Sequence, residues 1–212
     1  MRPAPASDCA LCPRLADLRR RSRAAFPDWH NAPVASFGDR RARLLVVGLA
    51  PGLRGANRTG RPFTGDFAGD LLYATLLEFG FALGDYGRRP DDGLQLIECR
   101  IANAVRCVPP QNRPIGSEVA NCRQFLTGEL LAEPRPRVVL TLGSIAHGST
   151  LRALALKENG FPFRHGAIYR PAGHPVLVPC YHCSRQNLNT GRLTPAMFAT
   201  VFSQVRALLQ SS

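Results

Sequence analysis

The sequence predicts an α/β protein: a three-layer sandwich in which helices flank a central four-stranded parallel sheet. Two observations carry this prediction. Four short apolar runs have the length of buried strands, and amphipathic segments long enough for helices lie between and after them. Strands that alternate with helices favour a parallel sheet covered on both faces. Ligands of such sheets bind beyond the carboxyl ends of the strands.

The expected strands are residues 43–47, 94–101, 137–142 and 176–181. Each is a run of aliphatic residues bounded by charged or turn-forming residues. Cys99 lies inside the second run and is expected to be a plain buried thiol. The connecting segments 84–93 and 109–116 are rich in Gly, Pro, Asn and Asp, which predicts exposed turns.

The expected helices are residues 66–79, 117–132, 144–155 and 194–209. In the first, apolar side chains from Phe67 to Phe79 recur at helical spacing, so we expect Phe67 to belong to the core. Asp66 and Ser117 are expected at the starts of the first two helices. Thr194 followed by Pro195 is a typical helix start.

Composition predicts one domain, residues 1–212, with a nucleic-acid partner. The chain has 27 Lys and Arg against 15 Asp and Glu, for a net charge of +12, and Lys157 is its single lysine. Arginine offers a planar fork of donors that fits phosphate. No apolar run reaches the roughly 18 residues of a membrane span, and the N-terminus lacks the apolar stretch of a signal peptide. We therefore expect a cytoplasmic protein without a membrane partner.

The loop after the first strand, GLAPGLRGANRTGRPFTGD at 48–66, does not match two common phosphate-binding motifs. It lacks the GK[ST] ending of a P-loop, and its glycines do not follow the dinucleotide-binding spacing. Residues 179–183, PCYHC, spell half of a zinc-deaminase signature. No His or Cys is followed two positions later by the glutamate that this chemistry needs, which excludes the deaminase.

Seven cysteines without an export signal favour metal ligation over disulfides. Cys9 and Cys12 form a CxxC pair, and Cys107 and Cys122 lie far downstream. Four thiolates can hold either zinc or an iron–sulfur cluster, and the spacing does not separate the two. We expect a structural metal centre that pins the N-terminal segment, residues 1–20, onto the body.

Four segments resemble family 5 (UDGb-type) uracil-DNA glycosylases of the branch that carries an iron–sulfur cluster. They are GLAPG at 48–52, NRTGRPFTGD at 57–66, IANAVRCVPPQNR at 101–113 and HCSRQNLNTGRLTPAM at 182–197. The pattern of Cys9, Cys12, Cys107 and Cys122 is similar to the ligand set of that family. The resemblance implies a structural [4Fe–4S] cluster and monofunctional excision of uracil from DNA, which leaves an abasic site. The resemblance also implies that hypoxanthine and etheno-cytosine could be substrates. Cys183 stands where the family usually has proline.

The resemblance also assigns roles at the rim of the sheet. Phe63 is expected to stack on a flipped base beside Gly48, and Asn103 to accept from uracil N3–H while donating to O4. The backbone N–H groups of Ala50 and Gly52 would face uracil O2 as an oxyanion hole, with His182 as a further donor.

The catalytic carboxylate is expected at Asp66. Related glycosylases position water with an aspartate or asparagine in the first loop, where this chain has Ala50. A carboxylate at Asp66 could stabilise the sugar cation and orient the attacking water, although it is also the expected helix cap. Asp70 is the alternative.

The expected partner is double-stranded DNA that contains uracil or another damaged base, bound by a monomer associated with the nucleoid. The residues expected at DNA are Arg185, Gln186 and Asn187 in the minor groove and Arg54, Arg58, Arg61 and Arg113 at phosphates. Two alternatives remain open: a non-enzymatic DNA-binding protein stapled by zinc or an iron–sulfur cluster, and an α/β enzyme of free nucleotides.

Overall fold

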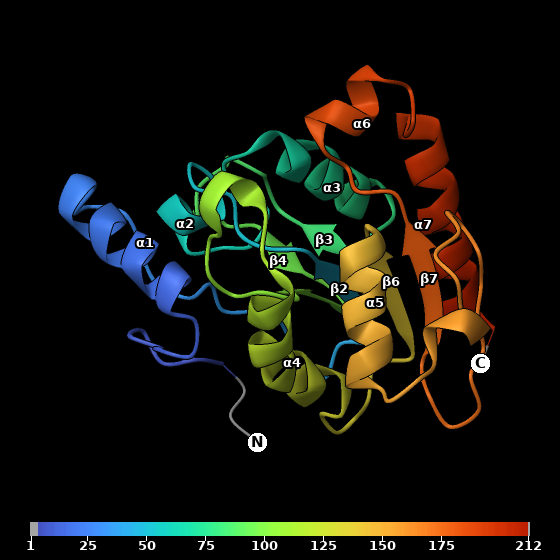
Figure 1. The fold of residues 1–212 in the computed structure, drawn as a ribbon. Helices are drawn as coiled ribbons and strands as arrows, with labels where there is room; N and C mark the ends of the chain where they lie inside the picture. The colour runs from blue at the N-terminus through green and yellow to red at the C-terminus, as the bar shows by residue number, and fades with distance from the viewer. Residues whose placement is uncertain (1–3, 212) are drawn as a thin grey trace.

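The computed structural model describes residues 4–211, and its centre is a five-stranded sheet (Figure 1). The strand order is β1 (Phe37–Gly38), β5 (Cys99–Asn103), β2 (Leu44–Gly48), β6 (Val138–Leu142) and β7 (Val176–Cys180). The last four are parallel to one another, which confirms the predicted parallel sheet. β1 adds an antiparallel edge that the sequence did not indicate, because two residues carry no periodicity.

The second predicted strand, 94–101, divides into two elements. Its first part is β4 (Gln95–Leu96), which pairs with β3 (Ala82–Leu83) in a separate two-stranded sheet. The parallel strand β5 begins only at Cys99, which is fully buried as expected. Glu98 separates the two parts with a left-handed backbone, φ 50°, which an uninterrupted strand cannot contain.

Helices cover both faces of the sheet, as the predicted three layers require (Figure 1). α4 (Gly116–Leu130) and α5 (Ser144–Ala153) pack on one face, and α3 (Phe67–Glu78) and α7 (Pro195–Gln210) on the other. Along β2, Leu45 and Val47 point to the first layer, whereas Leu44 and Val46 point to the second. Because both faces are buried, β2 is continuously apolar, and Thr141 is the one polar residue of β6.

Two of the three predicted helix starts are confirmed. Asp66 accepts a hydrogen bond from the Gly69 N–H at 3.1 Å, and Thr194 accepts one from the Met197 N–H at 3.2 Å. The start at Ser117 is wrong by one residue. α4 begins at Gly116, because the Glu118 carboxylate accepts from the Ile115 N–H and so fixes the first turn.

Among the described residues, three α-helices were not predicted: α1 (Pro13–Ala25), α2 (Ala56–Thr59) and α6 (Arg185–Asn189). α1 buries only a narrow stripe that includes Leu15 and Arg19, so its sequence lacks an apolar period. α2 and α6 are single turns within rim loops. Within residues 4–211, no helix is long and apolar enough to cross a bilayer.

Candidate functional site

A cleft of about 840 Å³ opens at the carboxyl ends of the parallel strands. The loops after β2, β5 and β7 all contribute to its walls, as their position on one rim predicted. The residues that line it are Leu49, Gly52, Leu53, Arg54, Gly55, Asp66, Phe67, Gln111, Asn112, Arg113, His182, Ser184, Arg185 and Gln186. Asp66 and His182 thus share one cavity.

Four residues expected to hold the base meet beside this cleft. Gly48 and Asn103 are paired across β2 and β5 at the ends of the two strands. A Cβ atom on Gly48 would lie 2.5 Å from both Asn103 Oδ1 and Phe63 Cζ, so any other residue here would displace one of them. The Phe63 and His182 rings stack with centroids 6.0 Å apart. Asn103 Oδ1 is buried and accepts no hydrogen bond within the described part of the chain.

The structure reverses the expected environments of two phenylalanines. Phe63 is 7% exposed and belongs to the apolar core, yet its backbone is left-handed with φ 53°. Phe67, expected in the core, is 38% exposed and lines the cleft, where the Arg185 guanidinium lies 5.1 Å from its ring centre. The helical period was right for α3, but its first turn projects beyond the sheet that buries the later turns.

Of the two donors expected in the GLAPG turn, Gly52 lines the cleft, whereas Ala50 is not among the lining residues. Within residues 4–211, the N–H groups of Ala50 and Gly52 donate to no protein acceptor. Burial lowers the pKa of His182 to about 4. The imidazole is therefore neutral at physiological pH, and a neutral ring can still donate through one nitrogen.

Asp66 combines its capping role with access to the cleft. One carboxylate oxygen, Oδ1, accepts from the Gly69 N–H, while Oδ2 faces the glycines of the opening loop. A Cβ atom on Gly55 would lie 2.5 Å from this oxygen. Burial raises the pKa of Asp66 above its usual value. Asp70 instead accepts from Arg88 at 2.8 Å and is not among the residues that line the cleft.

The residues expected at DNA do not all reach the cleft. Arg54, Arg113, Arg185 and Gln186 line it, whereas Arg58 is exposed outside its lining. Arg61 is 4% exposed and pairs with Asp92 at 2.6 Å, so its guanidinium is not available to a phosphate. The Asn187 amide donates to the His182 carbonyl at 2.8 Å and supports that loop from within.

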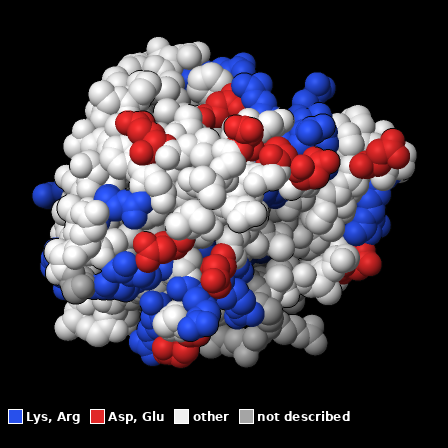
Figure 2. Space-filling view, turned by 180° about the vertical axis from the view of Figure 1, so that it is seen from behind, with Lys and Arg blue, Asp and Glu red and all other residues white. Residues whose placement is uncertain are grey.

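Sequence reasoning did not assign Gln111 and Asn112, which face the cleft from the loop after β5. Both have left-handed backbones, φ 55° and 57°, although neither is glycine. The turn-rich composition of 109–116 predicted an exposed loop, but it carried no signal for this conformation. On the side of the molecule seen in Figure 2, basic side chains are interspersed with acidic ones, whereas Asp66 is the one acidic residue of the cleft lining.

A second, smaller cavity gathers Cys9, Cys12, Cys107 and Cys122 between the N-terminal segment, the loop after β5 and α4. Donors point at the sulfur atoms: the Arg106 N–H lies 3.2 Å from Cys122 Sγ and the Asn121 amide 3.7 Å from Cys12 Sγ. Within residues 4–211, no three His, Cys, Asp or Glu side chains converge as ligands of a single ion.

Arg19 completes the surroundings of these thiols. It is 5% exposed, its Nη1 lies 3.7 Å from Cys107 Sγ, and its buried Nε has no partner within the described residues. Burial raises the pKa of Cys107 to about 12 and of Cys122 to about 11, so thiolates here require a compensating cation. Four thiols with a buried arginine and amide donors directed at sulfur are a donor set that suits an iron–sulfur cluster.

Comparison with known proteins identifies close relatives over almost the whole chain. Residues 35–206 match the profile of the family described as the Uracil DNA glycosylase superfamily. A type-5 uracil-DNA glycosylase of Thermus thermophilus is 43% identical over 206 residues, covering 94% of this chain and 93% of the relative. One from Mycobacterium leprae is 41% identical and covers 95% and 92%. A type-4 uracil-DNA glycosylase of Archaeoglobus fulgidus is 37% identical over 53% and 49%.

Proposed function

This chain belongs to the uracil-DNA glycosylase superfamily, among the type-5 enzymes, and from that premise we propose how its residues excise uracil from DNA. The reaction hydrolyses the N-glycosyl bond of uracil in DNA repair. Enzymes that act on a base within a duplex must first flip it out of the stack, at a cost of a few kcal/mol. The cleft at the carboxyl ends of the strands is the proposed site for the flipped nucleotide.

In this proposal the base stacks on Phe63, lies beside His182 and is read by Asn103. The observation that carries the proposal is the buried Asn103 Oδ1 without a partner. A buried acceptor without a hydrogen bond raises the free energy of the protein, and a ligand that donates to it removes this cost. Uracil N3–H supplies that donor, while the amide N–H₂ donates to O4. Cytosine presents an acceptor at N3 and a donor at N4, so both contacts would be mismatched.

Bond cleavage separates a positive sugar from a negative base, and the two walls of the cleft match these charges. The free N–H groups of Ala50 and Gly52 and the neutral His182 would donate to uracil O2 as charge develops there. Asp66 Oδ2 would face the sugar cation and accept a proton from the attacking water. No lysine nucleophile is needed, so the product is an abasic site.

We assign phosphate contacts to Arg54, Arg113 and Arg185, with Arg58 as an outer contact, and place Gln186 at the gap left by the flipped base. We propose that the protein acts as a monomer on double-stranded DNA. Hypoxanthine and etheno-cytosine are proposed as further substrates because the resemblance to family 5 enzymes implies them. Cys9, Cys12, Cys107 and Cys122 would hold a [4Fe–4S] cluster that ties residues 4–20 to the body.

The test uses a duplex with one uracil, followed by alkaline cleavage of any abasic site. With the wild-type protein, we expect a nick at the uracil position. No nick should form in a matched duplex that has thymine in place of the uracil. Parallel duplexes with hypoxanthine and etheno-cytosine rank the further substrates. Binding to the duplex without a nick would favour a non-enzymatic DNA-binding protein. Release of base from free nucleotides, but not from the duplex, would favour an enzyme of free nucleotides.

A further inference from the structure

The loop that carries Phe63 is held in an unfavourable backbone conformation. Phe63 has φ 53° and Gly65 has φ 88°, so two left-handed residues flank Thr64. For a residue other than glycine, this region is unfavourable and persists only where its surroundings impose it. The proposed base-stacking ring therefore depends on contacts that fix residues 61–65.

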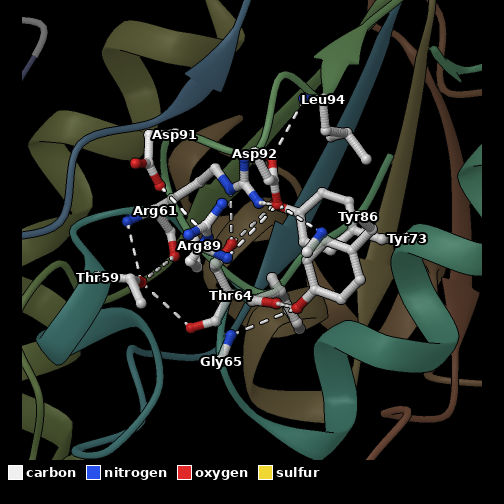
Figure 3. A network of polar contacts seen from close by, with 12 residues as sticks. Thr59, Arg61, Thr64, Gly65, Tyr73, Tyr86, Arg89, Asp91, Asp92 and Leu94 are labelled. Atoms are coloured by element: carbon white, nitrogen blue, oxygen red, sulfur yellow. Dashed lines mark hydrogen bonds and ion pairs between the residues drawn. The ribbon is translucent and has the colours of Figure 1, made fainter. Parts of the chain in front are cut away.

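Tyr86 supplies two of these contacts from a segment that is distant in sequence. Its hydroxyl donates to the Phe63 carbonyl at 3.1 Å and accepts from the Gly65 N–H at 3.3 Å. Both left-handed residues are thus bound by one oxygen atom, and Figure 3 shows the contact between Tyr86 and Gly65. The Tyr73 hydroxyl adds a bond to the Pro62 carbonyl at 2.7 Å, and its ring stacks on Tyr86 with centroids 4.4 Å apart.

An ion pair fixes the start of the same loop to the same segment. Arg61 and Asp92, with side chains 4% and 3% exposed, form two parallel hydrogen bonds at 2.8 and 2.6 Å. Arg61 Nε also donates to Thr64 Oγ1 at 2.7 Å. Its guanidinium lies 5.8 Å from the centre of the Tyr86 ring, as Figure 3 shows from close by.

The ionisation states that these contacts need are stable over a wide pH range. The Arg61 guanidinium lowers the pKa of Asp92 to about 2, so the carboxylate stays charged. Burial raises the pKa of Tyr86 to about 12, so its hydroxyl keeps the proton that it donates to Phe63.

We infer that Tyr86 is a positioning residue for uracil excision, which holds the Phe63 ring in place through the backbone of residues 63 and 65. The inference rests on the proposed function, in which Phe63 stacks on the flipped base. Tyr86 is not among the residues that line the cleft, so it acts through Phe63 and not on the substrate. Asp92 supports it by anchoring Arg61 two residues before Phe63.

Tyr86→Phe tests this inference, because it removes the hydroxyl but keeps the ring that stacks on Tyr73. We expect the single-turnover rate on a uracil duplex to fall about 10-fold to 100-fold, as for a small misplacement of a reacting partner. Affinity for an undamaged duplex should not change. Tyr169→Phe is the matched control, since it removes a hydroxyl that donates to the Pro162 carbonyl at 2.6 Å on another part of the surface. Its rate should equal the wild-type rate.

A double-mutant cycle with Phe63→Ala separates positioning from a general structural role. If Tyr86 acts through the Phe63 ring, adding Tyr86→Phe to Phe63→Ala should lower the rate by less than about 2-fold. Multiplying effects would overturn the inference, as would a Tyr86→Phe protein with the wild-type rate. The double-mutant cycle compares the effect of removing the Tyr86 hydroxyl in the wild-type and Phe63→Ala proteins. It therefore tests the inference even if the variants unfold at a lower temperature. An inactive wild type would refute the proposed function itself.

Discussion

At the scale of single residues, Asp66 combines a structural role as a helix cap with a proposed catalytic role. It caps α3 through one oxygen and presents the other to the cleft. We expect Asp66→Asn to lower the single-turnover rate about 10²-fold to 10⁴-fold, the usual contribution of a general base, with DNA affinity preserved. Asp70→Asn is the matched control, because Asp70 lies one turn further along and pairs with Arg88. A fully active Asp66→Asn protein would move the catalytic role elsewhere.

The same substitution should stabilise the protein at neutral pH. Burial raises the pKa of Asp66 in the folded state, so its favourable contribution is present at low pH and is lost as pH rises through that pKa. Asparagine carries no charge to bury and is an equally good helix cap. Thermal unfolding should show a higher Tm for Asp66→Asn at pH 7, and the difference should shrink as the pH falls through the raised pKa of Asp66 and be gone below about pH 4. A lower Tm at pH 7 would contradict the burial of a charged carboxylate.

His182 should act as a neutral donor over the whole working range. Because burial lowers its pKa to about 4, the pH profile of the single-turnover rate should show no inflection near the ordinary histidine value of about 6.5. His182→Ala should lower the rate about 10²-fold to 10³-fold, as when an oxyanion donor is removed. An inflection near pH 6.5 that disappears in His182→Ala would show that the charged form takes part.

Gly48 should tolerate no side chain, because its Cβ position overlaps Asn103 and Phe63. We expect Gly48→Ala to lower the rate at least about 10-fold, since a methyl group in a packed site costs roughly 1–3 kcal/mol. Undamaged duplex should bind as tightly as to wild type. Gly116→Ala, a glycine with no atom within 4 Å of its Cβ position, is the control and should be fully active.

The sequence identified the residues that meet at the base site but not the contacts that hold them. Gly48, Asn103 and His182 lie just after the ends of predicted strands, Phe63 lies in the loop after the first, and topology brings the four together. Tyr86 lies in a segment whose Gly, Pro and Asp content predicted only exposed turns. The Tyr86 and Asp92 side chains of this segment turn inward to Arg61. These tertiary contacts leave no pattern in the local sequence.

At the scale of elements, the cysteine cavity links the N-terminal segment to α4 and the loop after β5. We expect Cys107→Ser to lose bound iron and visible absorbance, and to expose α1 to trypsin, because its arginines would no longer be held on the body. Cys99→Ala, buried in β5 away from the cavity, should retain iron and protection. An iron-free wild-type protein that contains zinc would contradict the cluster.

Elements with a clear period were predicted to within a few residues, and elements without one were missed. β2, β6 and β7 are mainly aliphatic runs, and α3 and α7 have capped starts. α1 was not predicted because Leu15, Ala16, Arg19 and Ser22 are its buried positions, and half of these are polar. The break at Glu98 depends on the pairing of β4 with β3, a contact between segments that only the folded chain makes.

At the scale of the whole molecule, the excess of basic residues predicts that DNA affinity falls as the salt concentration rises. Each neutralised phosphate contributes about −0.9 to the slope of log affinity against log salt concentration. Arg113→Ala or Arg54→Ala should therefore reduce the slope by about one unit, for duplexes with and without uracil. Arg135→Ala, an exposed arginine paired with Glu133 away from the cleft, is the control and should leave the slope unchanged. Equal slopes for all variants would place the DNA elsewhere.

The whole account depends on uracil occupying the space between Phe63, Asn103 and His182. A crystal structure of the Asp66→Asn protein with free uracil tests this most directly. The account predicts the uracil ring stacked on Phe63, with N3–H donating to Asn103 Oδ1 and O2 facing the N–H groups of Ala50 and Gly52. Uracil bound elsewhere, or bound in the cleft with Asn103 Oδ1 still unpaired, would contradict it.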